Sequence, residues 1–137
     1  MTGGCVCGAV RYEISAKPLA MFCCHCRTCQ IVSGGAYTPI VLVPNKAFKL
    51  TQGAIKHHFT DSKRGEKHPH KRGFCTDCGS RLTGGESIHP RPWMAVTASS
   101  LDDPSIFKSQ FDIFASHAQA WDRLDPNVPK HAEYPPK

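Results

Sequence analysis

The spacing of the cysteines constrains this chain more than any other feature. Seven of its 8 cysteines fall into three short groups: a pair near the start, a triplet, and a pair beyond the middle. Two thiols one or two residues apart can bind a single tetrahedral metal ion from one tight turn, at about 2.3 Å from each sulfur. Such neighbours rarely form a disulfide, because their Cβ vectors seldom reach the required dihedral angle without strain. The groups are Cys5 and Cys7; Cys24, Cys26 and Cys29; and Cys75 and Cys78.

These seven cysteines divide naturally into four and three. A structural zinc ion takes four ligands, whereas a reactive one usually keeps three protein ligands and an open position. The sequence does not say which turn meets which, but joining the two pairs costs only a few kcal/mol of loop entropy. A structural zinc ion contributes roughly 10–16 kcal/mol. We therefore expect two zinc ions per chain, a structural one on Cys5, Cys7, Cys75 and Cys78 and an open one on Cys24, Cys26 and Cys29.

Two other arrangements stay open for these cysteines. The triplet could be a second closed site, completed by one of the 8 histidines, or the cysteines could bind no metal. Cys23 is the cysteine left over. Neighbouring side chains of an extended segment point to opposite faces, so we expect Cys23 to pack inward as a small apolar residue and not to join Cys24 on one ion.

Length and composition favour a single domain in a reducing compartment. A chain of 137 residues can build one core but not two, so we expect one domain over residues 1–137. No basic region followed by an apolar run begins the chain, and the longest apolar stretch, residues 40–43, is too short to cross a bilayer. The cytoplasm is the expected location. The net charge of +6 favours anionic partners, either phosphates or carboxylate-bearing metabolites.

Short alternating segments separated by turn residues predict a mainly β fold. A helical turn is expected over residues 27–32, ended by Ser33-Gly34-Gly35, and a polar loop over residues 61–70. Pro39 suggests an edge strand or a bulge, because proline cannot donate to the ladder. Prolines keep the tail, about residues 126–137, extended. Strands are expected over residues 8–14, 21–24, 36–43, 47–50, 54–60, 92–97 and 111–114.

The open three-cysteine site favours thiol chemistry over hydrolysis. Three thiolates leave a zinc site with net negative charge, so the ion is a weaker Lewis acid than one held by histidines. An added thiol is a soft ligand that zinc accepts well, and coordination would deprotonate it. Such a thiolate could attack, or be released by, a small electrophilic carbon.

The ordered cysteine motifs resemble one known family over nearly the whole chain. Gly3-Gly4-Cys5-Val6-Cys7-Gly8-Ala9-Val10-Arg11-Tyr12, the triplet followed by Ser33-Gly34, and Arg72-Gly73-Phe74-Cys75 through Cys78-Gly79-Ser80 carry the resemblance. Ser100-Leu101-Asp102-Asp103-Pro104 and the region of Trp121 are similar too. The family is that of the glutathione-dependent formaldehyde-activating enzymes, with its centromere protein V-like domain.

This resemblance implies a fold, two metal sites and an activity. The implied architecture is a β-tent of packed antiparallel sheets. The implied structural zinc lies on Cys5, Cys7, Cys75 and Cys78, and the implied catalytic zinc on Cys24, Cys26 and Cys29. The activity is the addition of glutathione to formaldehyde, formally a carbon–sulfur lyase reaction that gives S-(hydroxymethyl)glutathione.

Three further residues are candidates for substrate binding. Arg27 lies inside the triplet turn and could hold an anionic substrate beside the metal, or it could bond carbonyl groups of the turn. Ser33 and Gly34 could let a substrate approach the backbone closely, or form an ordinary turn. The basic stretch over residues 61–72 could clamp carboxylates or phosphates, and a solvated loop is its simpler interpretation.

We therefore expect a cytoplasmic, zinc-dependent carbon–sulfur lyase acting on a glutathione–aldehyde adduct or a related thiol adduct. Its expected partner is a small thiol such as glutathione, in preference to a membrane or nucleic acid. The alternative is a non-catalytic zinc-ribbon-like module that binds nucleic acid or protein through a basic face. A third possibility is a member of the family that has kept the fold and lost catalysis.

Overall fold

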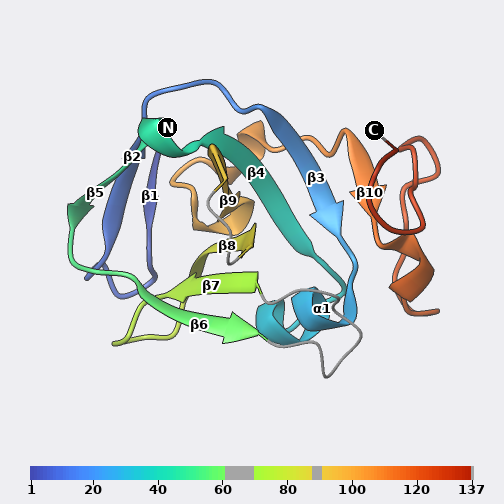
Figure 1. Ribbon diagram of the computed structural model, residues 1–137. Helices are drawn as coiled ribbons and strands as arrows, with labels where there is room; N and C mark the ends of the chain where they lie inside the picture. Colours follow the sequence, from blue (N-terminus) through green and yellow to red (C-terminus); the bar gives the residue numbers. More distant parts are fainter. Residues whose placement is uncertain (61–69, 88–90, 137) are drawn as a thin grey trace.

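The computed structural model describes residues 1–60, 70–87 and 91–136 and confirms the mainly β fold (Figure 1). One sheet has three strands in the order β1-β2-β5, and the other has seven in the order β10-β3-β4-β9-β8-β7-β6. Neighbouring strands run antiparallel except β10, which is parallel to β3. The strands are β1 (Thr2–Gly4), β2 (Arg11–Ile14), β3 (Ala20–Cys24), β4 (Thr38–Pro44), β5 (Phe48–Gln52), β6 (Lys56–Thr60), β7 (His70–Phe74), β8 (Arg81–Ser87), β9 (Trp93–Thr97) and β10 (Phe111–Ile113).

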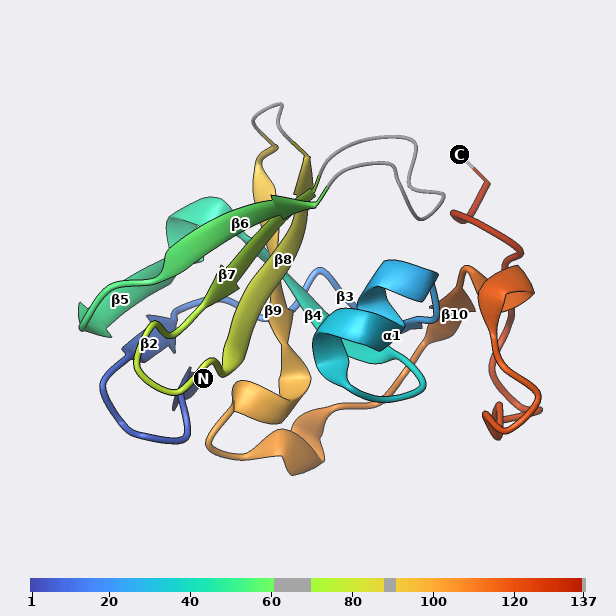
Figure 2. The same cartoon turned by 90° about the horizontal axis from the view of Figure 1, so that it is seen from below.

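The described residues contain one α-helix, α1 (Arg27–Ser33), which lies below the lower ends of β3 and β4 in the view of Figure 1 and in front of them in Figure 2. Its N-cap is Cys26, whose sulfur accepts a hydrogen bond from the backbone N–H of Cys29 at 3.3 Å. It ends at Gly34, which has the left-handed backbone (φ 72°) that glycine adopts without steric cost. The 3-10 helices are η1 (Asn45–Ala47), η3 (Ala98–Ser100), η4 (Pro104–Ile106) and η5 (Ala115–His117).

The main core fills the space between the two sheets. Period-two alternation places Tyr12 and Ile14 of β2 on one side of this core, opposite Val41 and Val43 of β4 and Val96 of β9. Tyr12 is 1% exposed, and its hydroxyl is 2.7 Å from the hydroxyl of Ser100. Burial of these apolar side chains fixes which face of the large sheet turns inward.

The other face of the large sheet carries a second, smaller core, which differs from the single core expected from the length of the chain. Cys24 and Ile40 point to this face, together with Ala95 and Ile113 on neighbouring strands. Cys23, one residue before Cys24, therefore lies on the opposite side of β3. It is buried, as expected, but belongs to neither apolar cluster.

Several elements differ from the sequence-based expectations. Strands β1, β7 and β8 were not expected, and β4 is a central strand in spite of Pro39. Pairing of β4 with β9 begins only at Ile40, so Pro39 lies just beyond that ladder and its missing N–H breaks no bond there. The expected polar loop over residues 61–70 falls, except for His70, outside the described residues.

The C-terminal tail packs along β10. The backbone N–H of Asp112 donates to the carbonyl of Pro129 at 2.8 Å, and that of His131 donates to the carbonyl of Asp112 at 2.9 Å. Its described residues form no α-helix, as its prolines predicted. None of the helices in the described part of the chain has the length and hydropathy needed to cross a bilayer.

Gly73 of β7 tests how tightly the large sheet is packed. A Cβ atom there would lie 2.1 Å from the Thr83 hydroxyl and 2.7 Å from a methyl group of Ile55, both far inside contact distance. We expect Gly73→Ala to lower the free energy of unfolding by about 1–3 kcal/mol, as overpacking does. The matched control is Gly35→Ala, since a Cβ at Gly35 meets only the Ser33 hydroxyl at 3.9 Å. Urea titrations of both variants give the comparison, and equal midpoints would contradict the packing described here.

Candidate metal centre

Four cysteines, two near the start of the chain and two beyond its middle, form the first cluster. The sulfurs of Cys5, Cys7, Cys75 and Cys78 all lie within 4.8 Å of one another. Cys5 and Cys7 are 3.5 Å apart at sulfur, and Cys7 and Cys75 are 3.8 Å apart. Four sulfurs around one zinc ion in tetrahedral geometry are about 3.8 Å apart. The cluster therefore has the donor type, number and spacing that a structural zinc ion requires.

Two similar turns bring these sulfurs together. In the first, Cys5 N–H donates to Val10 O at 3.1 Å and Gly8 N–H donates to Cys5 O at 3.1 Å. In the second, Cys75 N–H donates to Ser80 O at 3.0 Å and Gly79 N–H donates to Cys75 O at 2.8 Å. Gly8 (φ 80°) and Gly79 (φ 76°) occupy the left-handed region, which lets each turn fold back on its first cysteine.

Ser80 joins the two turns. Its hydroxyl accepts a hydrogen bond from the backbone N–H of Val6 at 3.1 Å and lies 3.1 Å from the sulfur of Cys78. Hydrogen bonding to Ser80 lowers the pKa of the Cys78 thiol to about 6. Cys78 is thus predisposed to the thiolate form that a metal ion binds.

Three buried cysteines at the start of α1 form the second cluster. Cys24 ends β3, Cys26 caps α1, and Cys29 lies in its first turn. Their sulfurs lie within 4.8 Å of one another, and within the described ranges no histidine or carboxylate joins them as a fourth donor. The three donors fit a zinc site that keeps one position for another ligand.

Charge within the triplet is uneven because the thiols are crowded. Hydrogen bonds from Cys24 and Cys26, with the nearby Arg72 guanidinium, lower the pKa of Cys29 well below its ordinary value. Hydrogen bonds with Cys26 and then Cys29, together with burial, raise the pKa of Cys24 well above its ordinary value. Arg72 is 4% exposed, and its Nη1 lies 3.6 Å from the Cys29 sulfur. One buried cation therefore already faces the triplet, and a metal ion would allow all three thiols to ionise.

His25 lies between two of these ligands but turns away from them. Its Nδ1 is 2.7 Å from a carboxylate oxygen of Asp122, and its Nε2 is 3.3 Å from one of Asp112. The ring is 2% exposed. This contact ties the start of α1 to β10 and to the C-terminal region. The sequence did not reveal it, because the two aspartates are about ninety residues away.

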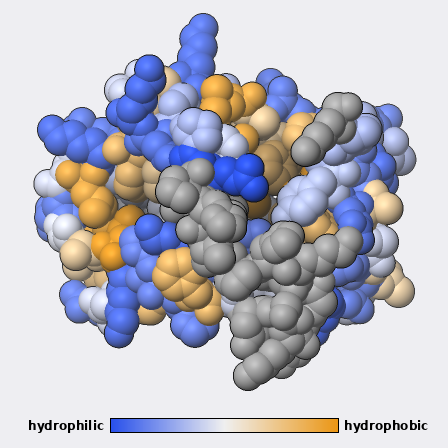
Figure 3. Space-filling model, in the orientation of Figure 1, coloured by the Kyte–Doolittle hydropathy of each residue, from blue (hydrophilic) through white to orange (hydrophobic). Residues whose placement is uncertain are grey.

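One cavity is lined by the triplet, and a second cavity adjoins the first. The first, of about 500 Å³, is lined by all three triplet cysteines and by aromatic and aliphatic side chains; we call it the apolar cavity. The second, of about 650 Å³, is lined by hydroxyl groups and by Arg11, Arg72 and Arg81; we call it the polar cavity. Ile40, Arg72 and Ala95 line both, so the two cavities adjoin. Near the centre of the face in Figure 3, apolar residues lie deep behind a polar rim.

Arg81 gives the polar cavity its charge. Burial, reinforced by the nearby Arg72, lowers the pKa of the Arg81 guanidinium to about 10, so it stays charged at neutral pH. Its Nε is buried and has no hydrogen-bond partner. Arg11, in contrast, is paired with Asp102, whose pKa it lowers to about 2. An anion entering the cavity would thus meet a charged group that lacks a full set of hydrogen bonds.

The three residues expected to bind substrate lie in different surroundings. Arg27 lines the apolar cavity, and its Nη1 donates to the side-chain oxygen of Gln30 at 2.6 Å. Ser33 lines the polar cavity, while its hydroxyl donates to Gln30 O at 3.3 Å and accepts from Gly35 N–H at 3.2 Å. Gly34 closes α1.

The arrangement matches known proteins in sequence and in fold. A crystal structure of a Rhodobacter sphaeroides protein shares the fold at a TM-score of 0.59 and 18% identity, over 96% of this chain and 100% of that chain. The sequence profile of the glutathione-dependent formaldehyde-activating enzymes matches residues 1–117. The match spans both cysteine clusters and most of the cavity lining, and the chain therefore belongs to the glutathione-dependent formaldehyde-activating enzyme family.

Proposed function

We propose that this chain is a zinc-dependent carbon–sulfur lyase acting on an adduct of glutathione, or of a related small thiol, with an aldehyde. The observation that carries the proposal is the three-cysteine cluster, which lines a cavity large enough for a ligand and gains no fourth protein donor within the described ranges. Family membership supports glutathione-linked formaldehyde chemistry.

Cys24, Cys26 and Cys29 would hold the zinc ion of this site. When bound, zinc supplies a position at which the sulfur of an added thiol is stabilised as thiolate. Arg72, whose Nη1 lies 3.6 Å from the sulfur of Cys29, offsets part of the negative charge of the three cysteines. The aromatic and aliphatic walls exclude water, which strengthens these interactions in the site.

The reaction joins sulfur to the carbonyl carbon. A sulfur lone pair forms the C–S bond, the carbonyl π pair moves to oxygen, and that oxygen takes the proton the thiol gave up. The reverse reaction breaks the same bond and releases thiol and aldehyde. The lining offers His70 and His117 near the triplet for proton transfer, and formaldehyde is electrophilic enough to react without them.

The polar cavity would hold the carboxylates of the thiol. Glutathione carries two carboxylates, and guanidinium groups bind carboxylates with charge-assisted hydrogen bonds. Arg81 provides such a group, and Ser33, Thr83 and Ser100 line the same cavity. Ser33 thus keeps its proposed role in substrate binding, while Gly34 shapes the end of the helix that presents it.

The rival function, a nucleic-acid or protein-binding zinc module, has less support. It was suggested by the zinc-ribbon-like cysteine turns and by the positive charge of the chain, but one of the cations, Arg72, is buried against Cys29 and does not contribute to an outer surface. The four-cysteine cluster fits either function, whereas a cavity beside the triplet favours the binding of a small ligand over that of nucleic acid or protein. We also propose a cytoplasmic location, because clustered cysteines in a reducing compartment are more often metal ligands than disulfides, and one domain over residues 1–137.

Cysteine substitutions should separate the two clusters. We expect Cys75→Ser to lower the free energy of unfolding by several kcal/mol and to reduce soluble yield, because a structural metal ion is part of folding. Cys26→Ser should leave a folded protein that binds about one zinc ion instead of two. This variant should no longer accelerate the formation and breakdown of the glutathione–formaldehyde adduct. Metal analysis and thermal unfolding of both variants test this. If Cys26→Ser unfolds the chain as severely as Cys75→Ser, the triplet is structural and the mechanism fails.

Exchange spectroscopy by NMR tests the activity itself. Glutathione and formaldehyde form the adduct without a catalyst when they are mixed. The measured quantity is therefore how much the protein accelerates the exchange between free glutathione and S-(hydroxymethyl)glutathione. We expect the wild-type protein to accelerate it and Cys26→Ser not to do so. No acceleration by zinc-replete wild-type protein would exclude the proposed reaction for this pair of substrates.

Substitution of Arg81 tests the carboxylate site. Losing a charge-assisted hydrogen bond costs about 1.5–3 kcal/mol, so Arg81→Gln should raise the KM for glutathione by about ten- to a hundredfold. The KM for 2-mercaptoethanol, which has no carboxylate, should change little. The matched control is Arg123→Gln, at an exposed arginine that lines neither cavity. Equal effects of Arg81→Gln on both thiols would assign Arg81 a structural role.

A further inference from the structure

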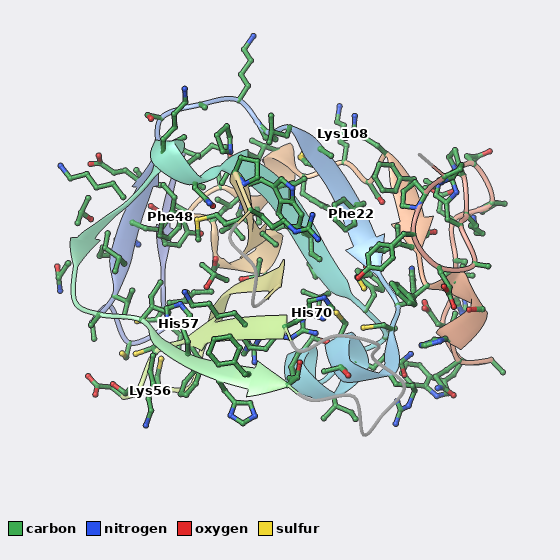
Figure 4. The ribbon with its side chains drawn as sticks, viewed as in Figure 1. Phe22, Phe48, Lys56, His57, His70 and Lys108 are labelled. Atoms are coloured by element: carbon green, nitrogen blue, oxygen red, sulfur yellow. The ribbon has the colours of Figure 1, made fainter. Side chains whose placement is uncertain are left out.

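The wall of the apolar cavity is one continuous face of the large sheet. Phe22 of β3 pairs with Ile40 of β4 and with Phe111 of β10, and Leu42 pairs with Ala95 of β9. Directly paired residues share a face, so these side chains form a single apolar surface that ends at the triplet. The rings of Phe22 and Phe111 stack with centroids 5.1 Å apart. Figure 4 shows Phe22 on β3 and His70 at the start of β7, two of the elements that contribute to the lining.

The other side of this cavity is formed by the C-terminal region. Phe114 and Tyr134 both line it, and their rings meet edge to face with centroids 4.9 Å apart. Trp93, at the start of β9, completes the aromatic lining. Aromatic and aliphatic groups therefore surround the space on the sheet side and on the tail side.

The volume of this cavity is far larger than formaldehyde requires. About 500 Å³ lies in the range of pockets that take whole metabolites, whereas formaldehyde has only a carbon and an oxygen. Its charged groups are Arg27, Arg72 and Glu133. Aromatic and aliphatic side chains make up most of the rest of the lining, which matches a hydrocarbon group better than a peptide.

The adjoining polar cavity indicates how an adduct would be oriented, with its thiol part in one cavity and its aldehyde part in the other. The two cavities share Ile40, Arg72 and Ala95, and the triplet lies beside Arg72. A sulfur at the triplet would therefore have a charged, hydroxyl-lined space on one side and an apolar space on the other. Carboxylates of the thiol suit the first, which leaves the second for the carbon substituent of the aldehyde.

We infer that the preferred aldehyde carries an aromatic or medium-length aliphatic group, which the apolar cavity binds beside the triplet. This inference rests on the proposed function and names the substrate class of the same site. Burying one methylene tightens binding by about fourfold. Chain length should therefore have a large, graded effect on turnover.

Fluorescence can test the cavity without any reaction. The chain has 2 tryptophans, Trp93 in the apolar cavity and Trp121, which is 65% exposed. Trp121→Phe leaves Trp93 as the single reporter, and Trp93→Phe is the matched control. The probe is 4-nitrobenzyl alcohol, an apolar alcohol whose nitro group quenches indole emission. We expect saturable quenching of Trp121→Phe protein and only linear, collisional quenching of Trp93→Phe protein; linear quenching in both would overturn the inference.

Turnover of an aldehyde series tests the substrate class. With glutathione fixed, exchange NMR gives the ratio of catalysed to uncatalysed rate for formaldehyde, acetaldehyde, butanal and phenylacetaldehyde. We expect this ratio to rise along the series, by about tenfold or more overall. Ala20→Leu, which narrows the cavity at the start of β3, should lower the ratio for phenylacetaldehyde relative to formaldehyde. Its control is Ala54→Leu, at an exposed alanine outside both cavities.

The outcomes distinguish this inference from the function on which it rests. Acceleration for formaldehyde alone, with none for the longer aldehydes, would overturn the inference and leave the lyase intact. No acceleration for any aldehyde would overturn both. Both are supported if acceleration increases with the size of the aldehyde in wild-type and Ala54→Leu protein and increases less in Ala20→Leu protein.

Discussion

The crowding of cysteine sulfurs at two points is the interaction on which the rest of this structure depends. The four-cysteine cluster joins a turn before β2 to a turn after β7, and so connects the small sheet to the far part of the large one. Thiols packed this closely cannot all ionise without a cation between them, as the opposite pKa shifts of Cys24 and Cys29 show. Metal binding and folding are thus expected to be coupled.

The two clusters differ in what surrounds them, and this difference gives them different functions. The four-cysteine cluster is formed by two tight turns, each of which supplies one buried and one exposed cysteine. The triplet lies at the end of a strand and the start of a helix, where the second core gives way to a cavity. Arg72 links the triplet to both cavities. The four-cysteine cluster, as a structural site, and the triplet, as a reactive site, therefore both use cysteine ligands and differ in what surrounds them.

The sequence pattern predicted those parts of the fold that are determined by residues close together in the chain. The cysteine turns, the helix that begins within the triplet and the alternating strand at Arg11–Ile14 follow from the nature and spacing of neighbouring residues. Strand β8 escaped prediction because two glycines interrupt its alternation. Arg72 was grouped with a basic loop, since no sequence pattern shows that a cation will face Cys29 across the fold. Likewise, the contact of His25 with Asp122 depends on tertiary packing.

Cobalt substitution offers the most direct measurement of the central claim. Co²⁺ replaces zinc in tetrahedral sulfur sites, and its visible and near-ultraviolet bands report the number of thiolate ligands. The protein should bind two cobalt ions per chain, and titration with glutathione should change the spectrum of one ion by adding a fourth thiolate while leaving the other unchanged. Two ions that both show four protein ligands before the thiol is added, and that do not respond to it, would contradict the account.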